Sequence, residues 1–242
     1  MHPKDLSPRR GAVEVWVVDL NALDHTLHPV YELLGEDERQ RAERFRFPID
    51  RRRFVMARAT LREILGRYLQ TAPEQLEFEY GEYGKPRLAR PHTSVRFNAS
   101  RSGERALIAC TQDHEIGVDI ESLSRELEID DLSRRFFTAS ESQKLATFPA
   151  DRRKEAFLRC WTCKEAFIKA VGKGFSLGLD KFNVSLGMGS PKVDASTPID
   201  KFIVDGWSLI PLASSALEGY ISALAIEGED AEVSLRSWGR SG

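Results

Sequence analysis

The sequence predicts an α+β protein made of two similar halves. The first half shows the order strand, helices, strands, and the second half repeats that order, although the halves share no convincing sequence similarity. A chain of 242 residues with 41% hydrophobic residues is also long enough to bury a real core. We expect an N-terminal half over residues 1–113 and a C-terminal half over residues 114–242.

The elements of the first half follow from its hydrophobic pattern. Residues 13–20 are β-branched and short, which predicts a buried strand. A polar helical pattern then ends at Pro48, and a helix with one apolar stripe follows. We expect helices over residues 35–47 and 50–69, a turn at residues 84–86 within the alternating stretch 76–88, and strands over residues 95–100 and 105–110.

The second half is expected to repeat this order. It begins with a strand over residues 116–121, and a helical stretch runs from about Ile129 to the early 170s. Strands are expected over residues 182–186, 202–210, 220–227 and 231–238, with the small polar segment 187–198 as a hairpin loop.

Composition limits the class of protein. The formal net charge of −2 and the pI near 6.3 argue against a general polyanion binder. The chain has an odd count of three cysteines, and its N-terminal segment lacks the apolar stretch of a secretion signal. We therefore expect the protein to work in the reducing cytoplasm. No apolar run approaches the roughly 18 to 20 residues that span a bilayer, so we expect a soluble protein.

Two acids mark the strand over residues 116–121. The strand period of two places Gly117, Asp119 and Glu121 on one face and the apolar residues on the other. Neighbouring like charges repel, and a hard cation such as Mg²⁺ between their oxygens would relieve the repulsion. A solvated pair of surface acids is the alternative interpretation.

A helix near residue 165 offers a third acid. Glu165 and Lys169 are four residues apart and share a helical face, a spacing that is also typical of an exposed helix pair. Cys160 and Cys163 lie inside the same helical pattern rather than at a helix N-terminus, and no second Cys or His pair has zinc spacing. We therefore predict that both cysteines are packing residues, and not a redox dithiol or half of a metal site.

The first half is rich in arginine. Ten arginines lie between Arg39 and Arg67, and most are expected to be solvated. Guanidinium groups match phosphate oxygens well, so their density also favours an anionic ligand. Turns further along the chain add Lys85, Ser100 and Arg101, where free backbone N–H groups suit phosphate.

Together, five motifs resemble the Sfp-type 4'-phosphopantetheinyl transferases over nearly the whole chain. In order they read GEYGKPRL, FNASRSGE, IGVDIE, RRFFTASE and WTCKEAFIKAVGKGFSLGLDKFNVS. The family's G-[IV]-D-[IV]-E strand and W-x-x-K-E-[AS]-x-x-K helix are both present without a gap. The resemblance implies the 4'-phosphopantetheinyl transferase fold, with two α/β halves related by a pseudo-twofold axis. It also implies coenzyme A between the halves, Mg²⁺ on its pyrophosphate and a carrier protein docking nearby.

The resemblance assigns roles to individual residues. Asp119, Glu121 and Glu165 match the metal-binding acids, and Glu165 is the expected acceptor of the serine proton. Lys169 matches the lysine that neutralises the pyrophosphate, so the catalytic pair is Glu165 and Lys169. Arg101 departs from the family pattern, because it stands where a phosphate-binding histidine is usual. The positions that match coenzyme A contacts are Arg41, Arg53, Lys85, Ser100, Arg101, Lys164 and Lys169, and Trp161 fills the remaining place of the helix motif.

We therefore expect a cytoplasmic transferase that depends on Mg²⁺, or on Mn²⁺. It moves the 4'-phosphopantetheine group of coenzyme A to a serine of an acyl or peptidyl carrier protein and releases 3',5'-ADP. We expect a monomer whose partners are coenzyme A and carrier proteins, without nucleic acid or membrane. One alternative is a nucleic-acid-binding module that uses the arginine-rich helices, which leaves the acids unexplained. Another is a metal-dependent phosphohydrolase that releases free phosphopantetheine.

Overall fold

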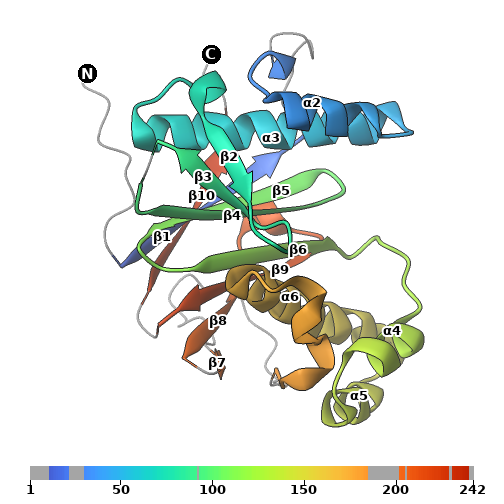
Figure 1. Cartoon of the computed structure of the whole chain (residues 1–242). Coiled ribbons are helices and arrows are strands. Elements are labelled where there is room, and N and C mark those ends of the chain that lie inside the picture. Colours follow the sequence, from blue (N-terminus) through green and yellow to red (C-terminus); the bar gives the residue numbers. More distant parts are fainter. Residues whose placement is uncertain are drawn as a thin grey trace.

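The computed structural model describes residues 11–21, 30–91, 93–184, 202–204, 206–228 and 231–239. The first half has the predicted order of strand, helices and strands, with α3 lying across its sheet (Figure 1). Its elements are β1 (Ala12–Asp19), α2 (Glu36–Glu43), α3 (Pro48–Leu69), a short 3₁₀ turn (Pro73–Gln75), β2 (Glu77–Tyr80), β3 (Pro86–Arg90), β4 (Val95–Ser102) and β5 (Arg105–Gln112).

Local signals set the ends of the long helix α3. Pro48 occupies its first turn, where a missing backbone N–H costs no helical hydrogen bond. Gln70 ends the helix in the left-handed conformation with φ 51°. The helices expected over residues 35–47 and 50–69 are thus confirmed as α2 and α3.

The second half starts with a strand and a set of helices and ends in strands. Its elements are β6 (Ile116–Ser122), α4 (Ile129–Phe136), α5 (Ala139–Ala146), α6 (Ala150–Val171), 3₁₀ turns at Gly174–Leu177, Leu179–Lys181 and Ser215–Leu217, β7 (Phe202–Val204), β8 (Trp207–Leu212), β9 (Tyr220–Glu227) and β10 (Glu232–Trp238).

The continuous helical stretch expected from Ile129 onward is wrong, because the segment forms three helices. Phe137 has an extended backbone, which ends α4. Thr138 then begins α5 with a capping box: its hydroxyl accepts a hydrogen bond from the Glu141 N–H at 3.2 Å, and the Glu141 carboxylate accepts one from the Thr138 N–H at 2.8 Å. Pro149 precedes the first residue of α6, where a proline also favours a new start.

Two strand predictions in the second half are corrected. In the described part of the strand expected over residues 182–186, the backbone is not in a strand. The strand expected over residues 202–210 is two antiparallel strands, β7 and β8, with a turn at Gly206, where φ is 80°. The hairpin loop expected over residues 187–198 lies outside the described residues.

The two halves repeat one topology. In the first sheet the order is β10-β1-β5-β4, and in the second it is β6-β9-β8-β7. In each half, the opening strand is followed by a helix of 22 residues and then by a hairpin whose last strand pairs antiparallel with the opening strand. This shared connectivity accounts for the two similar α+β halves that the sequence predicts.

The last strand of the chain belongs to the sheet of the first half. β10 pairs in parallel with β1. The rings of Trp16 and Trp238 pack edge to face with centroids 5.4 Å apart, and the Arg236 guanidinium lies 2.5 Å from the Glu14 carboxylate. The boundary expected after residue 113 stays a prediction, and β10 reaches across it.

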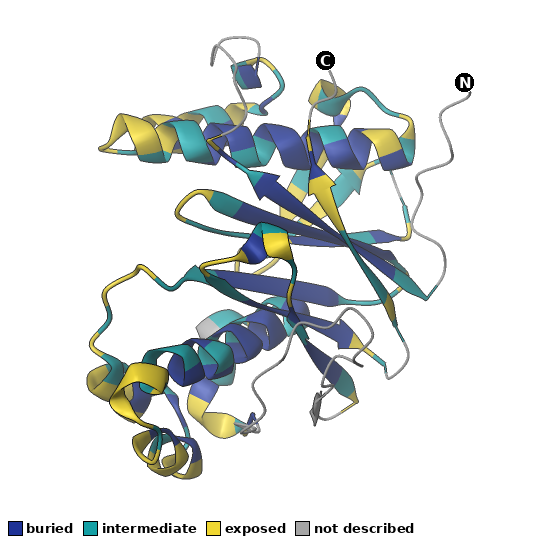
Figure 2. Cartoon of the chain, turned by 180° about the vertical axis from the view of Figure 1, so that it is seen from behind, coloured by how far each residue is buried: buried dark blue, intermediate teal, exposed yellow. Residues whose placement is uncertain are grey.

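Apolar side chains fill three spaces in a stack of helix, sheet, sheet and helix (Figures 1 and 2). Leu61 and Phe97 pack between α3 and the first sheet, and Phe167 and Leu209 pack between α6 and the second. Val118 belongs to a third cluster that joins the two sheets face to face. None of the helices in the described part of the chain combines the length and apolar character that a membrane crossing requires.

Candidate active site

Strand β6 lies directly against helix α6. A Cβ atom added at Gly117 would come within 2.1 Å of the Ala166 carbonyl oxygen and 2.4 Å of the Ala170 nitrogen, so this position needs glycine. Side chains two and four residues further along β6 leave on the same face. The missing side chain of Gly117 therefore lets Asp119 and Glu121 approach the acids and lysines of α6.

Lys169, Asp119 and Ser100 form a hydrogen-bonded cluster between the two halves. The Lys169 ammonium donates to the Asp119 Oδ1 at 2.6 Å and to the Ser100 hydroxyl at 3.0 Å, and Ser100 donates to the same Oδ1 at 2.8 Å. Asp119 is almost fully buried, whereas the Lys169 side chain is 29% exposed. The structure thus brings together three predicted site residues that come from β4, β6 and α6.

Glu121 lies beside this cluster with both oxygens engaged. Its Oε2 accepts a hydrogen bond from the Ser102 hydroxyl at 2.9 Å, and its Oε1 accepts one from the Arg125 guanidinium at 2.6 Å. The Arg125 side chain is about half exposed. The cation of this pair is thus open to water, although the Glu121 side chain is mostly buried, so another cation can replace Arg125 at this oxygen.

Glu165 lies close enough to both β6 acids to feel their charges. Burial raises the pKa of Glu165 from 4.5 to about 7, the negative charge of Asp119 adds to this rise, Lys169 opposes it, and Glu121 adds a smaller contribution. The Glu165 Oε1 and the Asp119 Oδ2 are buried and have no hydrogen-bond partner.

These acids fit a divalent cation. Two buried carboxylate oxygens without partners, beside a third carboxylate, suit a hard cation that prefers oxygen ligands. In the described residues, no three His, Cys, Asp or Glu side chains are gathered tightly enough to ligate one ion as they stand. Lys169 holds one oxygen of Asp119, and Arg125 holds one oxygen of Glu121.

A cluster of arginines lies on the opposite face of β4 from Ser100. Arg101 stacks over the ring of Phe45 at 5.5 Å, and Arg41 stacks over the ring of Phe54 at the same distance. Burial lowers the pKa of Arg101, the negative charge of Asp50 opposes this, and the positive charges of Arg41 and Arg53 lower it further. Three of the predicted coenzyme contacts are therefore neighbours, and like charges held together suit an anionic ligand.

Lys85 is anchored by the protein itself. Its ammonium donates to the Glu115 carboxylate at 2.5 Å and to the Ala170 carbonyl oxygen at 2.6 Å. The Lys85 side chain is only 8% exposed, and its methylenes lie against Gly172 at the end of α6. Lys85 therefore links the loop before β3 to the residue before β6 and to α6. Its contact with coenzyme A stays a prediction.

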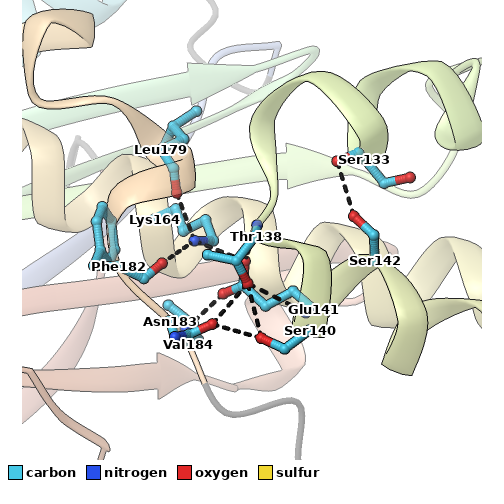
Figure 3. A network of polar contacts seen from close by, with 10 residues as sticks. All are labelled: Ser133, Thr138, Ser140, Glu141, Ser142, Lys164, Leu179, Phe182, Asn183 and Val184. Carbon is cyan, nitrogen blue, oxygen red and sulfur yellow. Dashed lines mark hydrogen bonds and ion pairs between the residues drawn. The ribbon is translucent and has the colours of Figure 1, made fainter.

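Lys164 does not lie where a coenzyme contact is expected (Figure 3). Its side chain is completely buried, and the ammonium contacts the carbonyl oxygens of Leu179 at 2.7 Å and Phe182 at 2.5 Å and the Glu141 carboxylate at 2.9 Å. Glu141 also accepts the N–H of Val184 at 2.6 Å. An ammonium whose three donors are used inside the protein cannot also bind a phosphate, so we correct the expectation for Lys164 to a structural role.

The cysteines and the tryptophan of α6 are packing residues. Cys160 and Cys163 are buried in the core beneath the second sheet, and burial raises the pKa of the Cys163 thiol to about 12. Trp161 stacks on Phe157 and meets the edge of Phe136. The prediction that these thiols are neither redox-active nor metal-binding is consistent with burial that keeps them protonated.

Sequence reasoning missed three residues that contact the predicted site. Ser102 and Arg125 bind Glu121, and Asn98 accepts the N–H of Val118 at 3.0 Å. One signal was available for two of these residues. Every second position of one strand carries Asn98, Ser100 or Ser102, so all three side chains leave on the same face. The predicted role of Ser100 could therefore have drawn attention to Asn98 and Ser102. The four-residue spacing of Glu121 and Arg125 gave no such signal. This spacing brings side chains together in a helix, and the segment after Ser122 is not helical.

The two repeated α+β halves meet at the cluster of Asp119, Lys169 and Ser100. Residues 115–206 match the 4'-phosphopantetheinyl transferase superfamily, and residues 20–113 match the model described as 4'-phosphopantetheinyl transferase, N-terminal. The chain therefore belongs to the 4'-phosphopantetheinyl transferase family, whose members move the phosphopantetheine group of coenzyme A to carrier proteins.

Similar proteins from bacteria carry the same name. The chain is 34% identical over 228 residues to the 4'-phosphopantetheinyl transferase HetI of Nostoc sp. (strain PCC 7120), with 93% of this chain and 92% of that protein covered. It is 34% identical over 179 residues to psf-1 of Bacillus pumilus, with coverages of 72% and 75%. It is 32% identical over 153 residues to Sfp of Bacillus subtilis, with coverages of 63% and 66%. The resemblance to the Sfp-type enzymes is confirmed.

Proposed function

We propose that this transferase depends on Mg²⁺ and modifies a serine of acyl or peptidyl carrier proteins, releasing 3',5'-ADP. The observation that carries the proposal is the pair of buried oxygens without partners, Asp119 Oδ2 and Glu165 Oε1, next to the Lys169 ammonium. Buried carboxylate oxygens that lack a partner destabilise the protein, so their presence supports a bound cation during function.

Asp119, Glu121 and Glu165 would hold the metal. Their oxygens are hard ligands, which favours Mg²⁺ and also admits Mn²⁺. When bound, the cation neutralises negative charge on the pyrophosphate of coenzyme A. Arg125 is the group that would give up its contact, because its side chain is about half exposed and water can take over its hydrogen bonds.

Lys169 and Ser100 would receive the pyrophosphate. The Lys169 side chain is partly exposed, and its ammonium contacts the buried Asp119 and the hydroxyl of Ser100 at the junction of the halves. A charged donor in this position stabilises the negative charge that develops on the leaving 3',5'-ADP. We assign Lys169 this role and Ser100 the role of orienting the ammonium.

Glu165 would take the proton of the attacking serine. The serine hydroxyl oxygen forms a bond to the β-phosphorus of coenzyme A, the bond from that phosphorus to the 3',5'-ADP oxygen breaks, and the proton passes to the Glu165 carboxylate. Glu165 is the candidate for this role because one of its carboxylate oxygens is buried without a hydrogen-bond partner beside Asp119 and Lys169.

Arg41, Arg53 and Arg101 would bind the phosphates of the nucleotide. Ser100 and Arg101 are consecutive residues of β4, so the pyrophosphate cluster and the arginine cluster lie on the two sides of one strand. Arg101, in place of the histidine that is usual in the family, keeps its charge through neutral pH and can grip two phosphate oxygens. A coenzyme that wraps around the end of β4 would reach both clusters.

We also propose that the protein acts as a cytoplasmic monomer without nucleic acid or membrane partners. The near-neutral formal charge of −2 supports one part of this proposal, because it argues against a general polyanion binder.

Mass spectrometry of carrier proteins tests the proposal. The enzyme is incubated with coenzyme A and a panel of apo acyl and peptidyl carrier proteins, in Mg²⁺ or in excess chelator. We expect the mass of one phosphopantetheine group on carriers in Mg²⁺ and none in chelator. Full transfer in chelator contradicts the metal dependence, and release of free phosphopantetheine without a carrier supports a phosphohydrolase instead.

A further inference from the structure

β4 and β6 are the edge strands of two different sheets, and they lie next to each other (Figure 1). Edge strands expose N–H and C=O groups that need partners. Among the described residues, no backbone pairing joins these two edges. Side chains of β4 satisfy the edge of β6 instead.

Three side chains at alternate positions of β4, those of Asn98, Ser100 and Ser102, join the two edges, and we call these contacts the polar seam. Asn98 accepts the N–H of Val118 at 3.0 Å, and Asn98 is nearly fully buried. Ser100 donates to Asp119, and two residues further Ser102 accepts the N–H of Ser122 at 3.1 Å. The spacing of two residues on β4 thus matches the spacing of the acids on β6.

Ser102 has a defined orientation because both of its bonding roles are used. Its oxygen accepts the Ser122 N–H, and its single hydrogen is donated to the Glu121 Oε2 at 2.9 Å. The other Glu121 oxygen accepts a hydrogen bond from Arg125, whose side chain is about half exposed. Ser102 is therefore the fixed partner of this carboxylate, and Arg125 is the exchangeable one.

We propose that Ser102 is a positioning residue for the transfer reaction, which holds the Glu121 carboxylate in the orientation that binds the metal. Asn98 supports it by setting the register of β6 against β4. The inference rests on the proposed role of Glu121 as a metal-binding acid. It gives the second serine of the FNASRS motif a task that differs from phosphate binding.

Direct metal binding tests the inference without relying on turnover. The full-length protein is titrated with Mn²⁺ in the presence of coenzyme A, and free Mn²⁺ is followed by electron paramagnetic resonance. We expect Ser102→Ala to weaken Mn²⁺ binding about tenfold, as loss of an outer partner of a metal ligand does. Ser102→Thr, which keeps the hydroxyl, should restore most of the affinity. Ser124→Ala is the matched control, because Ser124 is exposed and its hydrogen bonds within the described part of the chain go to Ser122.

Two further variants separate the possible outcomes. Ser102→Cys keeps the volume but is a weak donor, so it replaces Ser102→Ala if the alanine variant does not fold. If the Ala or Cys variant binds Mn²⁺ as tightly as the parent while Glu121→Gln binds weakly, the inference is wrong and the proposed function stands. If Glu121→Gln itself binds as the parent does, the metal role of Glu121 fails and the inference fails with it.

Discussion

Glu165→Gln offers a test of the site that requires no activity measurement. The glutamate is largely buried on α6, and burial together with the charge of Asp119 raises its pKa from 4.5 to about 7, against the opposing charge of Lys169. Glutamine has nearly the same shape and carries no charge. The substitution therefore removes an unfavourable charge from the metal-free protein while keeping the packing of the helix.

The size and sign of the effect follow from linkage. An acid whose pKa is raised by folding holds more protons in the folded state, so the free energy of unfolding falls as pH rises from about 4.5 to about 7. At about 1.4 kcal/mol per pKa unit, the ionised Glu165 side chain destabilises the parent by at most about 3 to 4 kcal/mol above pH 7. Partial solvent exposure reduces this value. We expect Glu165→Gln to be more stable by about 1 to 3 kcal/mol at pH 8, and equal to the parent near pH 4.5.

Urea unfolding in chelator at pH 4.5, 6 and 8 measures these differences. Glu155→Gln is the matched control, because Glu155 is a half-buried acid on the same helix that pairs with Arg159 at 2.7 Å. We expect the control to lose only a few tenths of a kcal/mol at pH 8. Saturating Mg²⁺ should then stabilise the parent more than Glu165→Gln, since ligands stabilise the state that binds them. If Glu165→Gln is no more stable than the parent at pH 8 without metal, burial and the neighbouring acids do not raise the pKa of Glu165 and the reasoning fails.

Three further predictions concern Arg101, Lys164 and the two cysteines of α6. Arg101→Ala should weaken coenzyme A binding by about 1.5 to 3 kcal/mol in titration calorimetry, and Arg101→His should recover part of it with a decline from pH 6 to pH 8; unchanged affinity of the alanine variant contradicts a phosphate contact. Lys164→Met should lower the free energy of unfolding by about 3 kcal/mol, because it leaves a buried carboxylate without its cation; an unfolding curve like that of the parent contradicts the structural role. Cys160→Ala combined with Cys163→Ala should keep transfer activity with a modest loss of stability, and inactivity of a folded variant would show a chemical role for a thiol.

The period of two along a strand predicted which face of β6 carries its acids, and the structure agrees. A strand period of two predicted that Ile116, Val118 and Ile120 face away from Asp119 and Glu121, and these three residues indeed lie in the core between the sheets. A backbone period fixes where a side chain points whatever the tertiary fold does. For the same reason, β1, α3 and β6 could be predicted well from the sequence.

The burial and the partners of the two α6 lysines could not be predicted from periodicity. Lys164 and Lys169 belong to the same motif and the same helix, yet one is completely buried and the other is partly exposed. The difference depends on which elements pack around α6. Lys164 points to Glu141 of α5, which is 23 positions earlier in the chain, and Lys169 points to Asp119 of β6. A motif shows that a residue type is required at a position, but the partner decides whether the requirement is structural or chemical.

The position of the site follows from how the two halves meet. The first sheet has β4 at one edge, and the second sheet has β6 at one edge. If these two edges paired through the backbone, they would form one continuous sheet with side chains alternating above and below it. In this protein the edges of β4 and β6 are joined by hydroxyl, amide and carboxylate groups. A polar seam of this kind collects acids beside donors in a partly buried space, and the closeness of β6 to α6 at Gly117 adds Glu165 and Lys169. Placing charged groups at a junction of two sheets costs stability, and the free energy that Glu165→Gln is expected to recover is a direct measure of that cost.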